Sequence, residues 1–200
     1  RLTDIDGIDL IFPLFAKPVA EGTGKGISAL SKIEDHETLR RVCRDLLVKF
    51  AQPVIVEEFL PGREFTVGIV GTGDAARVIA AMEVRFRKDD AVYSYENKEN
   101  YKERVDYCIL KDFALQKSVY SVALNSWRGL GCRDGGRVDI RLDSNDVPNF
   151  IEVNPLAGLN PIDSDLPIMC RLVGISYEQL IADIVHSAAD RIDCANSNPL

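Results

Sequence analysis

The residues best suited to chemistry are two acidic side chains and an amide, Asp139, Glu152 and Asn154. Apolar and polar residues alternate through the two segments that contain them, 137–143 and 149–154. This alternation is typical of half-buried β-strands. Asparagine and aspartate residues between the two segments favour a tight turn, so we expect an antiparallel hairpin.

The register of this hairpin would bring the polar residues together. A two-residue turn at 145–146 places Asp139 opposite Glu152, and Arg137 opposite Asn154. Like charges directly opposite each other destabilise a sheet. Two carboxylates and an amide oxygen on one face suit a hard divalent cation, typically Mg²⁺ held together with substrate phosphates. For an arbitrary hairpin we would favour a solvated polar face, but the other motifs of the chain favour the metal site.

Composition limits the class of protein. The chain has 200 residues, of which 46% are hydrophobic and 28% are charged, as in an ordinary globular protein with one domain or two small ones. Its formal net charge of −7 argues against a nucleic-acid or anionic-membrane surface. We find no apolar run that could span a membrane and no signal peptide. Five scattered cysteines favour a reducing compartment, which we take to be the cytoplasm. The polar start at Arg1 suggests a fragment of a longer protein.

Strands and helices alternate in an order that predicts an α+β fold with antiparallel sheets. We expect a small lobe over 1–84, a larger lobe over 85–194 and a frayed tail at 195–200. The expected helices lie at 35–51, at 112–129 and in two pieces near the C-terminus, and the expected strands lie at 14–19, 27–31, 53–59, 63–71, 76–84 and in the hairpin. The charged segment 85–110 has no clear period, so we expect a long loop there.

A second candidate site is the glycine-rich segment AKPVAEGTGKG at 16–26. Its alternating glycines let backbone amides approach a phosphate closely, and Lys17 and Lys25 add positive charge. The segment lacks the spacing of a Walker A loop and the βαβ surroundings of a dinucleotide fingerprint. Taken alone, such a loop is more often a plain hairpin turn than a phosphate clamp.

A third candidate is the apolar strand VIVEEFL at 54–60, which runs into two glutamates. Exposed backbone at the end of such a strand could bind the edge of an adenine, and a carboxylate such as Glu64 could bind ribose hydroxyls. An edge strand that carries charges against aggregation is an equally good interpretation of this segment alone.

These segments occur in the order found in the ATP-grasp superfamily, and the chain most resembles the D-alanine–D-alanine ligases within it. The resemblance runs from about residue 12 to about residue 190 and rests on Lys17-Pro18, Glu21-Gly-Thr-Gly-Lys-Gly26, Val56-Glu-Glu-Phe-Leu60, Glu64-Phe-Thr-Val67, Tyr95-Glu-Asn-Lys98, Gly136-Arg-Val-Asp139 and Glu152-Val-Asn154. It implies an ATP-grasp fold, in which two α+β lobes with antiparallel sheets hold ATP between them. It also implies the central and C-terminal domains of the family without the N-terminal domain.

The resemblance assigns roles to individual residues. Those assigned to ATP are Lys17, Glu21, Gly22, Thr23, Gly24, Glu57, Glu58, Phe59, Leu60, Glu64 and Lys98. Among these, Lys17 and Lys98 match the lysines that bind the phosphates. The segment 88–104, which carries Lys98, is expected to close over ATP as a lid.

The remaining assignments concern the metal and catalysis. Asp139, Glu152 and Asn154 match the ligands of Mg²⁺, or of Mn²⁺ in its place, in agreement with the hairpin register. Arg137 and the backbone N–H of Gly158 would stabilise an oxyanion. Ser164 would hold the carboxylate of the second substrate.

The activity implied by the resemblance is an ADP-forming, ATP-dependent carboxylate–amine ligase that uses an acyl phosphate and small amino-acid-like substrates. It further implies a place in peptidoglycan synthesis and a homodimer formed through the N-terminal region. Glu99 and Gly24 depart from the family pattern where substrate choice is made. The alternatives are an ATP-grasp ligase that joins other amino or hydroxy acids and, in a different class, an ATP-binding module without catalysis.

Overall fold

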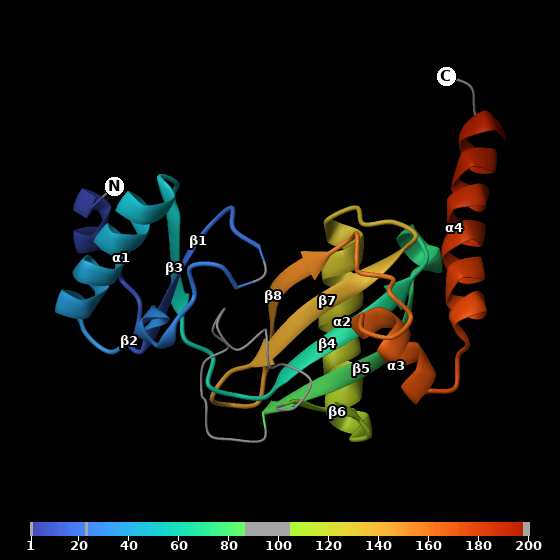
Figure 1. The fold of residues 1–200 in the computed structure, drawn as a ribbon, viewed down its shortest axis with the longest axis horizontal. Coiled ribbons are helices and arrows are strands. Elements are labelled where there is room, and N and C mark those ends of the chain that lie inside the picture. Colours follow the sequence, from blue (N-terminus) through green and yellow to red (C-terminus); the bar gives the residue numbers. More distant parts are fainter. Residues whose placement is uncertain (1, 23, 87–104, 198–200) are drawn as a thin grey trace. The chain divides into compact units, whose positions relative to one another are not determined.

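The structure is a computed structural model that describes residues 2–22, 24–86 and 105–197. The chain forms two compact units (Figure 1). Unit 1 contains the described residues up to Leu60, and unit 2 contains those from Pro61 to Arg85 and from Asp106 onward. The lid expected at 88–104, which contains Lys98, lies outside the described residues.

Unit 1 is a three-stranded antiparallel sheet with a helix against it. Strand β1 (Leu14–Pro18) lies between β2 (Lys32–Ile33) and β3 (Val54–Glu58). Helix α1 (His36–Phe50) contacts all three strands, and the short 3₁₀ helix η1 (Leu2–Gly7) contacts α1. The second strand expected at 27–31 is wrong, because a 3₁₀ turn capped by Ser28 occupies most of that segment and the strand begins only at Lys32.

Helix α1 forms where the sequence supplies both a cap and an apolar face. The side chain of Asp35 accepts the N–H of Thr38 at 2.8 Å, which satisfies one of the free donors of the first turn. Four residues at helical spacing are buried against the sheet and form the core of the unit with β1: Leu39, Val42, Cys43 and Leu46. The expected helix at 35–51 is therefore confirmed.

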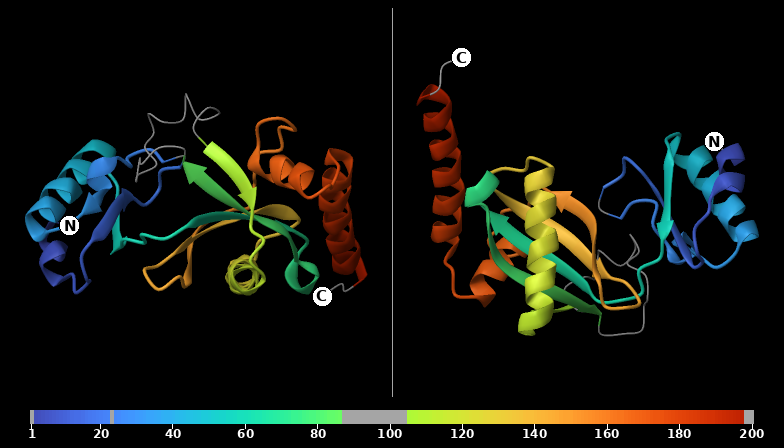
Figure 2. Two further views of the ribbon diagram at one scale, coloured as in Figure 1. Left: turned by 90° about the horizontal axis from the view of Figure 1, so that it is seen from below. Right: turned by 180° about the vertical axis from the view of Figure 1, so that it is seen from behind.

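Unit 2 is a five-stranded antiparallel sheet with the order β6-β5-β4-β7-β8. Its strands are β4 (Glu64–Val70), β5 (Arg77–Phe86), β6 (Val105–Ile109), β7 (Gly135–Leu142) and β8 (Pro148–Asn154), with the 3₁₀ turn η3 (Gly73–Ala75) between β4 and β5. Its helices are α2 (Phe113–Gly129), α3 (Asp165–Leu172) and α4 (Tyr177–Ser197). Helix α2 covers one face of the sheet and α3 lies on the other (Figure 2).

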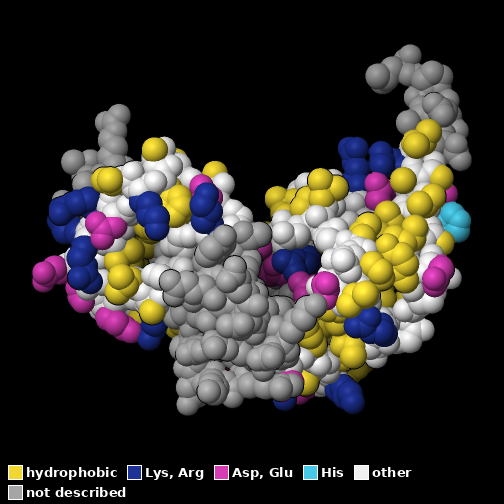
Figure 3. All heavy atoms as spheres, in the orientation of Figure 1, with side chains coloured by type: hydrophobic (Ala, Val, Ile, Leu, Met, Phe, Trp, Pro, Cys, Tyr) yellow, Lys and Arg dark blue, Asp and Glu magenta, His cyan; other side chains and the backbone are white. Residues whose placement is uncertain are grey.

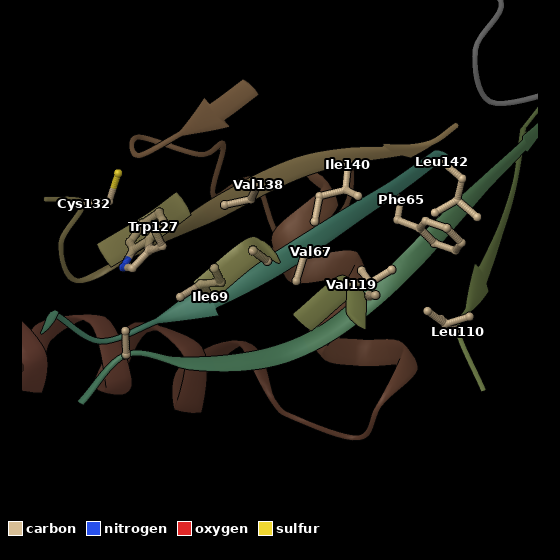
Figure 4. Packing of buried hydrophobic residues seen from close by; sticks show 13 residues of the cluster. Phe65, Val67, Ile69, Leu110, Val119, Trp127, Cys132, Val138, Ile140 and Leu142 are labelled. Carbon is tan, nitrogen blue, oxygen red and sulfur yellow. The ribbon is translucent and has the colours of Figure 1, made fainter. Parts of the chain in front are cut away.

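The main core of unit 2 lies between α2 and the sheet (Figure 4). Trp127 of α2 is fully buried and donates its indole N–H to the carbonyl oxygen of Gly71 at 3.1 Å. Alternate residues of the two central strands, such as Val67 and Val138, complete this core. Because alternate side chains of a strand point to opposite faces, the other residues of β4 and β7 must face α3 or solvent.

The structure divides the chain elsewhere than at the boundary that we expected at residue 84. The division falls between Leu60 and Pro61, because β4 pairs with β5 on one side and with β7 on the other. Residues 64–85 therefore belong to unit 2. Strand β6 was also missed, since the segment 85–110 carries no periodicity that would reveal it.

Surface charge is mixed in both units. On the face drawn in Figure 3, acidic and basic side chains are interspersed with apolar ones. Among the described residues, no helix combines the length and the apolar character needed to cross a bilayer.

Gly136→Ala should destabilise the protein, because an added Cβ would lie 2.5 Å from the carbonyl oxygen of Asn154 and 2.8 Å from the ring of Trp127. Overpacking of this kind costs roughly 1–3 kcal/mol in the free energy of unfolding. Gly129→Ala is the matched control, because nothing lies within 4 Å of a Cβ at that position. In urea denaturation, we expect the midpoint to be reduced for Gly136→Ala and not for Gly129→Ala. Equal midpoints for the two variants would contradict this packing.

Candidate functional site

The polar residues of β7 lie on the face of the sheet opposite α2. Arg137 pairs directly with Gly68 of β4, so the two residues face the same side. A Cβ at Gly68 would meet Leu166 and Met169 of α3 at 2.8 Å, which places α3 on that side. The same strand alternation that buries Val138 under α2 therefore directs Arg137 toward α3.

The expected pairing of the hairpin is confirmed. Strands β7 and β8 pair Asp139 with Glu152, and Arg137 with Asn154. Both carboxylates and the amide thus lie on one face, next to the arginine. Asp139 is partly buried, whereas Glu152 is exposed.

The turn expected at 145–146 is wrong, but a β-bulge in β8 still brings Asp139 opposite Glu152. The N–H of Asp143 donates to the carbonyl of Val147 at 2.9 Å, which closes a loop one residue longer than a two-residue turn. Strand β8 then carries one extra residue, Ile151, between the partners of Asp139 and Ile140. The two one-residue shifts cancel, so the pairing beyond the bulge is the expected one.

The two carboxylates converge on a single donor. The side-chain Nδ2 of Asn154 donates to Asp139 Oδ2 and to Glu152 Oε1, in each case at 3.2 Å. Thr66 of β4 donates its hydroxyl to the other oxygen of Asp139 at 2.9 Å. Sequence analysis missed Thr66, although the alternation of Glu64-Phe-Thr-Val67 places it on this face.

Electrostatics favours a cation at this point. Burial, together with the charge of Glu152, raises the pKa of Asp139 to about 6 against the opposing effect of Arg137. Burial also raises the pKa of Glu64, and Arg141, whose Nη1 lies 3.4 Å from the carboxylate, opposes that rise. A positive ion between Asp139 and Glu152 would favour the charged form of Asp139 and so oppose the rise in its pKa.

The ligand set fits a hard divalent ion. With a cation in the position of the Asn154 amino group, rotation of the amide would present its oxygen beside the two carboxylates. Among the described residues, no group of three or more His, Cys, Asp and Glu side chains could hold a metal by itself. Asp139, Glu152 and Asn154 would therefore supply part of the coordination and leave the rest to phosphate oxygens and water, as is typical of Mg²⁺.

A pocket of about 260 Å³ opens beside these residues, lined by Arg137, Asn154, Gly158 and residues 163–166 among others. A Cβ at Gly158 would lie 2.6 Å from the hydroxyl oxygen of Ser164. That oxygen also accepts the N–H of Asn160 at 3.0 Å, so its proton remains available to a ligand. The structure thus brings together the three residues expected to act in catalysis.

Unit 1 brings together several residues expected to bind ATP. Lys17 of β1 and Glu57 of β3 form an ion pair with Nζ and Oε1 2.7 Å apart. The ring of Phe59 lies 6.3 Å from that of Phe15, and the ammonium group of Lys32 lies 5.1 Å from its centroid. Two further members, Glu58 and Leu60, continue the same segment at the end of β3.

The glycine-rich loop is held by its own acidic residue. The carboxylate of Glu21 accepts Nε2 of Gln52 at 2.9 Å and lies 3.0 Å from Nζ of Lys25. Gly24 adopts a φ of 73°, and the carbonyl of Gly22 accepts the N–H of Lys25 at 3.1 Å. Glu21 therefore shapes the loop, a role that sequence analysis did not assign. Thr23 lies outside the described residues.

Residues 7–186 match the model of the family described as D-ala D-ala ligase C-terminus. The D-alanine–D-alanine ligase of Bordetella petrii is 32% identical over 182 residues, which cover 90% of this chain and 53% of that protein. The ligase of Aquifex aeolicus is 34% identical over 174 residues, which cover 87% of this chain and 56% of that protein. The chain spans about half the length of the curated relatives it matches.

Solved structures support the fold. The VanG D-Ala:D-Ser ligase of Enterococcus faecalis superposes with a TM-score of 0.71 at 24% identity. The superposition covers 93% of this chain and 52% of the chain of that ligase. The D-alanine–D-alanine ligase of Bacillus anthracis, solved with ATP, gives a TM-score of 0.69 at 20% identity, with 95% and 56% covered. The ATP-grasp fold with antiparallel sheets is therefore confirmed.

Asp139→Asn should stabilise the protein when no divalent metal is present. A pKa raised in the folded state means that folding binds a proton between pH 4 and 6, so stability falls as pH rises through that window. Asp139→Asn has no carboxylate to ionise here and does not lose stability in this way. Its free energy of unfolding should therefore exceed that of the parent by roughly 1–3 kcal/mol at pH 7, but not near pH 4.

Urea denaturation in EDTA at several pH values tests this expectation, with Asp74→Asn at an exposed carboxylate as the control. The expectation is contradicted if the difference in the free energy of unfolding between Asp139→Asn and the parent does not grow from pH 4 to pH 6. Ionisation of Asp139 would then not destabilise the folded protein.

Proposed function

The chain belongs to the D-Ala–D-Ala ligase family, and from this premise we propose that it is the ATP-dependent part of a carboxylate–amine ligase that forms ADP. The observation that carries the proposal is the meeting of Asp139, Glu152 and Asn154 with Arg137 at the edge of a pocket. This arrangement offers a cation site and a fixed positive charge next to space for a small substrate.

The chemistry requires activation of an acid. A carboxylate is a poor electrophile, so transfer of the terminal phosphoryl group of ATP to its oxygen first forms an acyl phosphate. Asp139, Glu152 and Asn154 would hold Mg²⁺, which when bound neutralises charge on the phosphates. An amine then attacks the acyl carbon, a C–N bond forms, the bond to phosphate breaks, and the nitrogen loses a proton.

Arg137 and the pocket serve the second half of the reaction. Attack by the amine places negative charge on the acyl oxygen, and the guanidinium of Arg137 with the N–H of Gly158 would stabilise it. Removal of one such donor typically costs about 3–4 kcal/mol of transition-state stabilisation. The hydroxyl of Ser164 would donate to an oxygen of the second substrate. None of these roles requires a side-chain nucleophile.

Each residue assigned to ATP would bind a particular part of the nucleotide. Lys17, together with Lys98 outside the described residues, would bind phosphates. The segment from Glu57 to Leu60 would contact adenine, and Glu64 would bind the ribose hydroxyls. The ion pair of Lys17 with Glu57 supports the proposal, because it holds the lysine in a fixed position.

The substrates are proposed as a class. Relatives of this family are named D-alanine–D-alanine ligase, and one of similar fold is named D-Ala:D-Ser ligase. We therefore propose small amino-acid-like substrates, either D-alanine or other amino or hydroxy acids. A cytoplasmic location, a place in peptidoglycan synthesis and a homodimer through an N-terminal region complete the proposal, and they rest on the family alone.

ATP with Mg²⁺ should raise the melting temperature, because a ligand that binds only the folded state stabilises it.

Asp139→Asn and Glu152→Gln should fold yet lose ATP-dependent ADP release by at least about 100-fold, the effect typical of removing an electrostatic group at a transition state. Asp146→Asn, in the turn of the same hairpin, is the control.

A coupled ADP assay with a panel of D-amino acids and D-hydroxy acids measures turnover, and mass spectrometry identifies the product. If ATP binds but no acid or amine is consumed, the ATP-binding module without catalysis is the better description. Near-native turnover of either carboxylate variant would contradict the metal assignment.

A further inference from the structure

Arg137 is held between two carboxylates that come from different elements. Its Nη2 lies 3.5 Å from Oδ2 of Asp139, and its Nη1 forms an ion pair with Oδ2 of Asp165. Asp165 is the first residue of α3, and only 20% of its side chain is exposed. Tyr107 of β6 donates its hydroxyl to the other carboxylate oxygen of Asp165 at 3.2 Å.

The position of Arg137 creates an electrostatic problem once a metal is bound. A divalent cation at Asp139 and Glu152 would take over the negative charge that Arg137 now contacts. The guanidinium would then face a doubly charged ion of the same sign. Without another anion, Arg137 would either compete with the metal for Asp139 or leave the pocket.

We propose that Asp165 is a positioning residue that holds Arg137 in the pocket beside an occupied metal site. Its charge balances the guanidinium when Asp139 no longer does. The inference rests on the proposed function for the identity of the cation and for the task of Arg137, whereas the contact itself rests on the structure alone.

The surroundings of Asp165 suit this role. Leu166 and Met169 of α3 are fully buried, and the helix can approach the sheet because β4 carries Gly68 at the contact. The start of α3 is therefore fixed against the sheet that also carries Arg137. The hydrogen bond from Tyr107 orients the carboxylate of Asp165. Because the guanidinium group is a rigid planar fork, an oriented carboxylate also orients Arg137.

The test measures metal binding without nucleotide, so that it does not depend on turnover. Mn²⁺ is titrated into the protein and the free ion is followed by electron paramagnetic resonance. Asp165→Asn should weaken Mn²⁺ binding by about three- to tenfold, because Arg137 then repels the ion and competes for Asp139. Asp165→Glu, which keeps the charge, should retain most of the affinity.

Two comparisons separate this effect from general damage. Asp183→Asn breaks a similar ion pair between a helix aspartate and a strand arginine, Arg77, and should leave Mn²⁺ affinity unchanged. In an Arg137→Ala background, Asp165→Asn should cause a clearly smaller loss than in the parent, because no guanidinium remains to be released. Equal losses in the two backgrounds, or no difference between Asp165→Asn and Asp183→Asn, would overturn the proposal.

Turnover gives a second reading. Asp165→Asn should lower kcat more than it changes KM for ATP. Tyr107→Phe should lower kcat to a lesser degree, because this variant keeps the charges of Asp165 and Arg137. If the parent shows no ATP-dependent ligation, the proposed function fails while the Mn²⁺ titration still decides the role of Asp165. If the parent turns over and Asp165→Asn matches Asp183→Asn in both readings, the role of Asp165 fails alone.

Discussion

The pairing of Asp139 with Glu152 across two strands is the interaction on which the candidate site depends. Like charges in this position destabilise a sheet, and the structure surrounds them with groups that reduce the repulsion. Thr66 and Asn154 donate hydrogen bonds, and Arg137 supplies positive charge. These partners reduce but do not remove the cost, since burial and mutual repulsion still raise the pKa of Asp139. The remaining imbalance is what a divalent cation would relieve.

The rigidity that holds the two charges together comes from the other face of the same strands. Alternate residues of β7, such as Val138, are buried under α2, and the intervening residues form the polar face. Glycine is needed on both sides, because Gly136 lets Trp127 approach and Gly68 lets α3 approach. The core and the site are therefore positioned by one strand, and a change of register by one residue would exchange them.

Sequence analysis succeeded where local pattern decides the structure. Strand alternation predicted the pairing of Asp139 with Glu152, although the assumed turn was one residue too short and the bulge at Ile151 restored the register. It failed where long-range contacts decide. Strand β6 forms by pairing with β5, and the bond of Asp165 to Arg137 depends on how α3 docks on the sheet. No spacing in the sequence encodes either contact.

Anomalous X-ray scattering from crystals grown with Mn²⁺ and a non-hydrolysable ATP analogue tests most directly whether Asp139, Glu152 and Asn154 form one cation site. We expect an anomalous peak about 2.1 Å from an oxygen of each carboxylate, the distance expected for a small hard divalent cation. We also expect the amide of Asn154 to turn its oxygen toward the ion. A peak elsewhere, with the amino group of Asn154 still between the two carboxylates, would contradict it.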